Sequence, residues 1–199
     1  MAFGYKVYFS NRAEDQVMAW NPDTGKSQII AGKGSETPET KISDPYGLCM
    51  DPKGRLLIAD KFHHRILRVD QGKCEKLETK DIDGHRKRRA INHRHDPITP
   101  TGLFAEKKGS ILACFCDENT VYRIHEDGRL ELLLGISPSR HYVVDHFTES
   151  ATGKDVQNTP VCKPTHIVET KDGTIFVIER AHHVIRRYNV QDGLSCLFP

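Results

Sequence analysis

Hydrophobic and polar residues alternate in short runs along this chain, and most runs end at a turn that contains glycine. In one representative segment, apolar residues form short runs over 48–50 and 56–59 and predominate over 65–69, with a further short run near 73–78. Runs of this length and period predict β-strands, and glycine at the intervening turns relieves the positive φ angles that tight hairpins require. The segment therefore predicts four antiparallel strands joined by short turns.

The four-strand pattern recurs. Residues 47–69, 102–124 and 166–188 align without a gap, and residues 6–20 fit the same register from the second strand onward. A single four-stranded sheet of this size cannot bury both of its faces, so successive sheets must stack. Radial stacking is the usual solution for such repeats, and the sequence therefore predicts an all-β fold, a β-propeller of four-stranded antiparallel blades.

We expect one propeller domain over residues 1–199, with about four visible blades and two long insertions. The expected blades are 5–34, 44–80, 98–136 and 162–199, and the insertions are 80–97 and 137–163. The first blade lacks its inner strand, since only four residues precede Tyr5. An incomplete or open ring leaves sheet edges and apolar blade faces uncovered, which favours protein partners or additional blades on the open side.

A paired histidine precedes the third strand in two blades, as His63-His64-Arg65-Ile66 and His182-His183-Val184-Ile185. With GLCMDPKGRLLIADKFHHRILRVD at 47–70, these segments resemble NHL-repeat propellers and the related gluconolactonase and strictosidine-synthase-like six-bladed propellers. The resemblance implies that His64 and His183 pack and hydrogen-bond between blades. Because such propellers include hydrolases, lyases, RNA binders and scaffolds, the resemblance does not decide function.

Each later blade starts with a proline motif on what we call the upper face, the face that also carries the loops between second and third strands. The motif predicts four channel-mouth residues, which are Tyr46, Thr101, Thr165 and His166. In lactonase-like relatives the resemblance implies Asn or Asp at the first three positions, binding a divalent metal. Hydroxyl groups are poor ligands for a hard cation, so the sequence leans against an enzyme and predicts no catalytic residue, metal or cofactor.

The first insertion carries a basic run, HRKRRAINHRH at 85–95, without an acidic residue. Residues of both insertions are candidates for binding a partner, and they are Arg86, Lys87, Arg88, Arg89, His93, Arg94 and His95 with Tyr142 and Phe147. The basic run fits a solvated loop, an acidic protein surface, an anionic lipid headgroup or a nucleic acid. It contains no aromatic residue to stack on bases, which favours a protein over RNA.

Equivalent polar residues end the second strands of three blades, and they are Asn11, Asp60 and Glu179. We expect them to hold the upper loops through hydrogen bonds with backbone amides. Trp20 is expected to pack in the core of its blade. The six cysteines are expected to be reduced structural thiols.

Composition changes this picture little. With 28% charged residues, 37% hydrophobic residues and a net charge of +2, the chain is typical of a globular protein and is not a polycation. The start MAFGYKVYFS lacks the features of a secretion signal and no apolar run could span a bilayer, so we expect an intracellular protein, cytoplasmic by default.

The sequence favours a non-catalytic protein-binding or assembly module of the NHL-propeller type, which uses its upper-face loops as an interface, with an open blade edge as a further candidate. The alternatives are a metal-dependent lactonase or strictosidine-synthase-like hydrolase, and an RNA-binding protein that uses residues 85–95.

Overall fold

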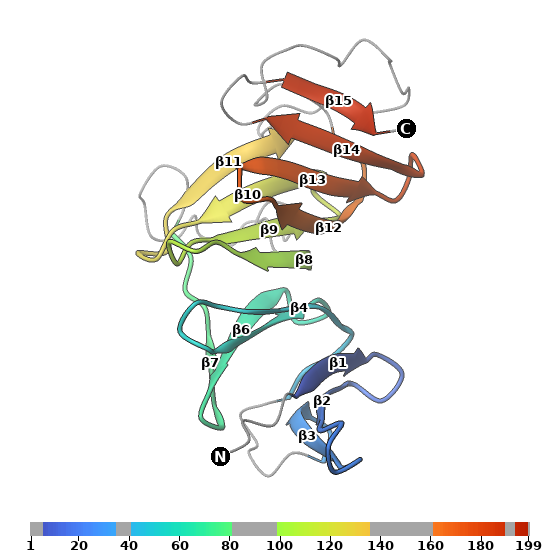
Figure 1. The fold of residues 1–199 in the computed structure, drawn as a ribbon, viewed down its shortest axis with the longest axis vertical. Helices are drawn as coiled ribbons and strands as arrows, with labels where there is room; N and C mark the ends of the chain where they lie inside the picture. The colour runs from blue at the N-terminus through green and yellow to red at the C-terminus, as the bar shows by residue number, and fades with distance from the viewer. Residues whose placement is uncertain (1–5, 35–40, 81–98, 136–160, 190–193, 199) are drawn as a thin grey trace, which may run out of the picture.

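The computed structural model describes residues 6–34, 41–80, 99–135, 161–189 and 194–198. In this part of the chain, fifteen strands form four antiparallel sheets, and no helix is present. Three sheets have four strands and the first has three (Figure 1). This confirms the expected blades, including the first blade without an inner strand.

The strands follow the chain order within each sheet. Blade 1 contains β1 (Val7–Asn11), β2 (Gln16–Trp20) and β3 (Ser27–Gly32). Blade 2 contains β4 (Pro45–Met50), β5 (Leu56–Asp60), β6 (Arg65–Asp70) and β7 (Lys73–Lys76). Blade 3 contains β8 (Pro100–Ala105), β9 (Ile111–Phe115), β10 (Thr120–Ile124) and β11 (Leu130–Gly135). Blade 4 contains β12 (Pro164–Glu169), β13 (Thr174–Glu179), β14 (Val184–Asn189) and β15 (Leu194–Phe198).

The blades follow one another along an arc. The inner strands β4, β8 and β12 lie side by side on the concave side with β1, while β3, β7, β11 and β15 fan out on the opposite side (Figure 1). The arc is open, because blade 1 and blade 4 lie at its two ends. The concave side is the channel side of a propeller.

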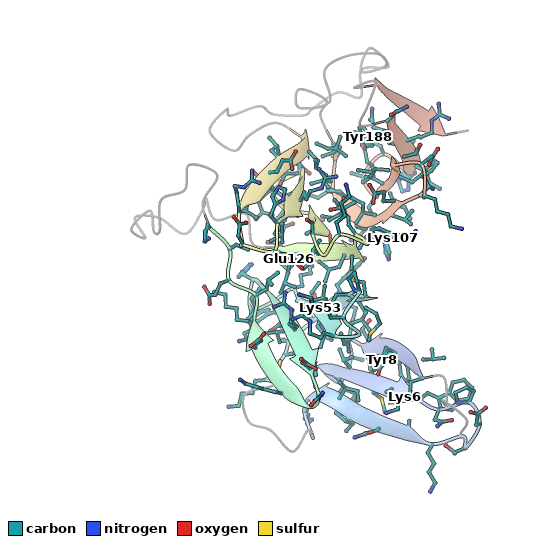
Figure 2. The ribbon with its side chains drawn as sticks, turned by 60° about the vertical axis from the view of Figure 1, so that its left-hand side comes forward. Lys6, Tyr8, Lys53, Lys107, Glu126 and Tyr188 are labelled. Atoms are coloured by element: carbon teal, nitrogen blue, oxygen red, sulfur yellow. The ribbon has the colours of Figure 1, made fainter. Side chains whose placement is uncertain are left out.

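Three hydrophobic clusters fill the spaces between successive blades (Figure 2). Alternation within each strand divides its side chains between two neighbours: Leu57 and Ala59 pack toward blade 3, while Leu56 and Ile58 pack toward blade 1. Each buried large aliphatic side chain contributes about 1.5–3 kcal/mol relative to exposure. Stability therefore depends on both faces of a blade being covered.

Glycine allows the inner strands to approach one another closely. A Cβ atom added at Gly47 would lie 2.1 Å from the carbonyl oxygen of Thr101, and one added at Gly102 would lie 2.7 Å from the Cα of His166. The next equivalent position is His166 itself, which is exposed because no further blade follows it among the described residues. The proline motif thus sets the spacing of the inner strands.

Residues with left-handed backbone conformation tether each upper loop to the start of the next blade. Asp15 (φ 53°) accepts a hydrogen bond from the backbone N–H of Asp44 at 2.7 Å. Asn119 (φ 56°) accepts one from the N–H of Lys163 at 2.8 Å. His64 has the same conformation and its Nδ1 lies 3.4 Å from the hydroxyl of Thr99, in agreement with the expected contact between blades.

The expectation for Trp20 is wrong, since 39% of its surface is exposed. Its counterparts Val69 and Tyr188 are buried because their side of the sheet packs against the preceding blade. Blade 1 is the first sheet of the arc, so the same side of its sheet has no blade to pack against. The predicted position of Trp20 within the repeat was correct, but a side chain at that position is buried only where another blade packs against the same side of the sheet.

The antiparallel order of the strands predicts that the first insertion starts on the upper face, but in the structure Lys80 lies elsewhere. The backbone N–H of Lys80 donates to the carbonyl of Gly128 at 2.7 Å, in the turn between β10 and β11. That turn lies at the opposite end of the strands from the upper loops, because the third strand runs away from them. The chain therefore leaves blade 2 along the outer edge of blade 3.

Candidate functional site

The channel side of the upper face carries a row of three side chains from three blades. The guanidinium carbon of Arg12 lies 4.7 Å from the centroid of the Tyr46 ring. The same ring lies 6.0 Å from the His166 ring, centroid to centroid, with a tilt of 58°. Two of the four predicted channel-mouth residues are therefore brought together. Arg12, the first residue of the upper loop between β1 and β2, carries no sequence signal for this role.

Arg12 is held in place by Asp44, the residue before the proline motif of blade 2. Its guanidinium donates a short hydrogen bond to the Asp44 carboxylate, and Lys61 approaches the other carboxylate oxygen at 3.4 Å. The hydrogen bond from Arg12 holds the pKa of Asp44 below its ordinary value, against the opposing effect of burial. The row is therefore a charged and aromatic surface at neutral pH, suited to stacking and hydrogen bonding.

The other two predicted channel-mouth residues are buried and bonded to backbone. The hydroxyl of Thr101 donates to the carbonyls of Pro164 at 2.9 Å and Cys114 at 3.3 Å, and it thereby links blades 3 and 4. The hydroxyl of Thr165 donates to the carbonyl of Ile178 at 3.5 Å. These hydroxyls serve the packing of the inner strands.

The site does not fit the divalent metal of lactonase-like propellers. Tyr46 supplies a phenol, and both threonine hydroxyls are committed to backbone carbonyls. Within the described ranges, no group of three His, Cys, Asp or Glu side chains converges as a metal site requires.

Buried carboxylates organise the upper loops of blades 2 and 4, as expected for Asp60 and Glu179. Asp60 accepts hydrogen bonds from the N–H of Ser43 at 2.8 Å and from Arg65 at 2.7 Å, and it lies 3.0 Å from the ring of His63. In blade 4, Glu179 makes the equivalent contacts with the N–H of Cys162, with His182 and with Arg186. Both histidines are therefore positioned by a structural carboxylate.

Within the described part of the chain, Cys49, Cys114, Cys116 and Cys162 form no disulfide bond. Burial raises the pKa of Cys49 to about 12 and raises that of Cys114 further, so both remain protonated at neutral pH. The remaining predicted binding residues, which are Arg86, Lys87, Arg88, Arg89, His93, Arg94, His95, Tyr142 and Phe147, lie outside the described residues.

The two ends of the arc expose apolar side chains at positions that are buried elsewhere. On blade 1, Val7, Phe9 and Trp20 are 49%, 40% and 39% exposed. On blade 4, the exposed residues are Val168, Ile178 and Ile185, at 44%, 40% and 42%. We call these two surfaces the leading face and the trailing face. The repeat register that defines them was visible in the sequence, but their individual residues were not singled out.

The two faces are complementary halves of one kind of interface. Val7 and Phe9 are equivalent to Leu56 and Ile58, which pack against the preceding blade. Ile178 and Ile185 are equivalent to Ala59 and Ile66, which pack against the following blade. Among the described residues, no blade precedes the leading face and none follows the trailing face.

No protein-family model matches the sequence, and no curated protein sequence matches it. Solved structures do match the fold. A virginiamycin B lyase from Staphylococcus aureus matches with a TM-score of 0.57 at 17% identity, covering 99% of this chain and 53% of that one. A putative gluconolactonase matches with a TM-score of 0.62 at 15% identity, covering 97% of this chain and 58% of that one. An auxiliary nutrient binding protein from Bacteroides ovatus matches with a TM-score of 0.64 at 16% identity, covering 99% of this chain and 46% of that one.

These similarities establish a β-propeller fold and leave the NHL type unsupported. The chain spans about half the length of these three structures. Within the described ranges, none of the secondary structure is a helix long and apolar enough to cross a membrane.

Proposed function

We propose that this chain is a protein-assembly module that binds partner proteins through its leading and trailing faces. The observation that carries the proposal is the exposure of Val7, Phe9 and Trp20 at one end of the arc and of Ile178 and Ile185 at the other. Large apolar residues that gather on one side of a sheet mark interaction surfaces in folded proteins. The channel row of Arg12, Tyr46 and His166 has no comparable support as a catalytic site. Ser10 lies next to this row, but its hydroxyl donates to the Tyr46 carbonyl and not to a base that could activate it as a nucleophile.

The partner surface that fits each face best is another propeller blade. Inside the chain, leading-type and trailing-type faces meet three times, once between each pair of successive blades. The chain itself therefore carries both halves of the interface, and two copies can bind head to tail. Such heterologous contacts form a closed ring when the rotation per copy closes, and an open polymer when it does not.

The test is the native mass of the purified chain and of two variants, measured by light scattering over a range of concentrations. Trp20→Glu places a charge on the leading face, and Ile178→Glu places one on the trailing face. We expect the unmodified chain to form a particle of twice the monomer mass and each variant to be a monomer. Mixing the two variants should restore a dimer through the one intact pair of faces.

Phe62→Glu is the matched control, since Phe62 is 68% exposed on the upper loop between β5 and β6 and belongs to neither face. It should self-associate as the unmodified chain does. A chain that stays monomeric at all concentrations, or a mixture of variants that remains monomeric, would contradict the proposal.

A further inference from the structure

The inner edge of blade 1 has the form of a strand site. Among the described residues, β1 pairs only with β2, whereas the equivalent strands β5, β9 and β13 each pair with an inner strand as well. A strand edge offers a row of backbone donors and acceptors that an extended peptide can use. An inner strand, as the other blades have, would pair with β1 on the channel side. On that side β1 also contacts β4, the inner strand of blade 2.

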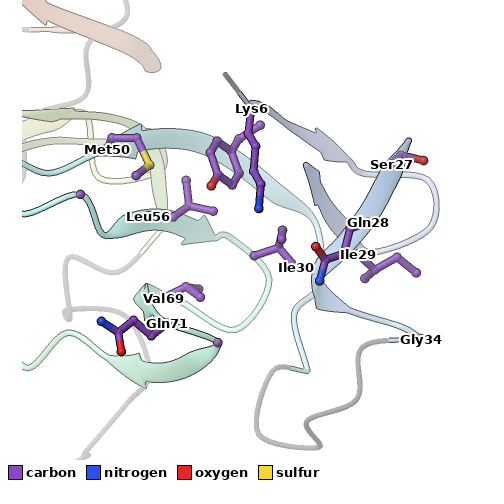
Figure 3. Close-up of a pocket in the computed structure, with 13 residues that line it drawn as sticks. Lys6, Ser27, Gln28, Ile29, Ile30, Gly34, Met50, Leu56, Val69 and Gln71 are labelled. Carbon is purple, nitrogen blue, oxygen red and sulfur yellow. The ribbon is translucent and has the colours of Figure 1, made fainter. Parts of the chain in front are cut away.

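A groove opens between blades 1 and 2, and on blade 1 it reaches from Lys6 and Tyr8 at β1 to residues 27–30 of β3. Its volume is about 650 Å³, which lies within the range of ordinary binding pockets. Tyr8 and Ile30 contribute one wall, and Met50, Leu56 and Val69 contribute the other (Figure 3). Between blades 2 and 3, the inner-strand residue Cys49 packs against the cluster of buried residues. Among the described residues, blade 1 has no inner strand that would supply an equivalent residue, and Met50 is 43% exposed.

The other blades specify the register and the side chains of a fitting strand. Leu57 and Leu112 are equivalent to Tyr8, and they pair with Cys49 and Phe104. A strand on β1 would therefore run antiparallel to it and place an apolar residue opposite Tyr8. The preceding residue, opposite Phe9, corresponds to Leu48, Leu103 and Ile167, and is apolar in every blade.

Charge specifies a further position. Lys6 lines the groove. None of the described residues that line the groove has an acidic side chain. In blade 2 the equivalent of Lys6 is Arg55, whose guanidinium forms an ion pair at 2.6 Å with Asp51, the residue that follows the inner strand. A fitting strand would carry an acidic residue at the same place, beside Lys6. Blade 3 has Glu106 at this position.

We propose that the free edge of β1 and this groove bind an extended segment of another polypeptide that completes blade 1. The segment has two adjacent apolar residues, opposite Phe9 and Tyr8, and an acidic residue two positions later, beside Lys6. The proposal rests on the chain being a protein-binding module, but it uses the backbone edge of β1 and the groove, and it shares Phe9 with the leading face.

The test uses the full chain and a synthetic peptide with the sequence of residues 99–106, TPTGLFAE, which meets all three requirements. Calorimetry measures binding, and hydrogen exchange read by mass spectrometry locates it. We expect saturable binding that slows amide exchange in residues 7–11. A peptide with Phe replaced by Asp should bind at least about tenfold more weakly, because it would bury a charge between Tyr8 and Met50.

Reversing the charge pair separates a specific site from general adhesion. Lys6→Glu should weaken binding of TPTGLFAE, and a peptide ending in Lys should recover affinity for that variant. Lys107→Glu, which changes an exposed lysine on a turn of blade 3, is the matched control and should bind as the unmodified chain does. Absence of saturable binding, or protection that appears outside β1, would overturn the proposal even if the two faces still drive assembly. Self-association lost on Trp20→Glu with peptide binding retained would support it independently.

Discussion

At the scale of single residues, the buried carboxylate of Glu179 is the most demanding feature of the upper loops. It is fully buried beside Arg186, which is 4% exposed, and it also accepts the N–H of Cys162. Removing one partner of a buried ion pair leaves an uncompensated charge. We expect Glu179→Gln to lower the free energy of unfolding by about 3–5 kcal/mol, measured by urea denaturation at pH 7.

The double variant Glu179→Gln/Arg186→Met should recover most of that loss, because the uncompensated guanidinium is removed with its partner. The pair of Arg12 and Asp44 provides the contrast, since Arg12 is half exposed. Asp44→Asn should cost at most about 1 kcal/mol, as solvent screens such pairs. An equal loss in Glu179→Gln and Asp44→Asn would show that burial does not set the strength of these contacts.

At the scale of elements, glycine fixes the distance between inner strands. A methyl group at position 102 would meet backbone atoms, namely the Thr165 carbonyl oxygen and the His166 Cα, each at 2.7 Å. Backbone cannot rotate away as a side chain can, so β8 and β12 would have to separate. We expect Gly102→Ala to destabilise the chain by about 1–3 kcal/mol, measured by urea denaturation.

Gly25→Asn is the control for Gly102→Ala. Gly25 has a φ of 69°, which asparagine tolerates, and no atom lies within 4 Å of an added Cβ. The control should change stability by less than about 0.5 kcal/mol. If both variants behave alike, close approach of the strands is not the reason for glycine at position 102.

The strands were predictable because the alternation of short apolar runs with polar turns is a local property of the sequence. Pro52-Lys53-Gly54 and the apolar run 56–59 define a turn and a buried strand without reference to the rest of the fold. The environment of Trp20 was not predictable in this way, since its burial depends on a blade that would precede β1. The course of Lys80 toward Gly128 was missed for the same reason: a contact between blades leaves no periodic signal.

The candidate site was predictable in part. The proline motif identified Tyr46 and His166, which meet in the channel row. It could not show that Thr101 and Thr165 turn their hydroxyls to backbone carbonyls, because that depends on the spacing of the inner strands. Arg12 joins the row from the upper loop equivalent to residues 61–64, and only the fold brings it to Tyr46.

At the scale of the whole molecule, stability should be graded along the arc. In arrays of repeats, each unit is stabilised mainly by its nearest neighbours. Strands β5 and β9 of the middle blades are buried along their whole length, whereas β1 has an unpaired edge and exposed Val7 and Phe9. We expect amide hydrogens of β5 and β9 to exchange at least about tenfold more slowly than those of β1, measured by mass spectrometry.

The same measurement connects the gradient to assembly. In the Trp20→Glu variant, which should stay monomeric, β1 to β3 and β12 to β14 should exchange fastest at every concentration. In the unmodified chain, these end blades should gain protection as the concentration rises, while β5 and β9 change little because both faces of their sheets are already covered. Uniform protection across all four blades in the monomer would contradict the nearest-neighbour account, since the cost of an uncovered blade face would then be shared by the whole chain.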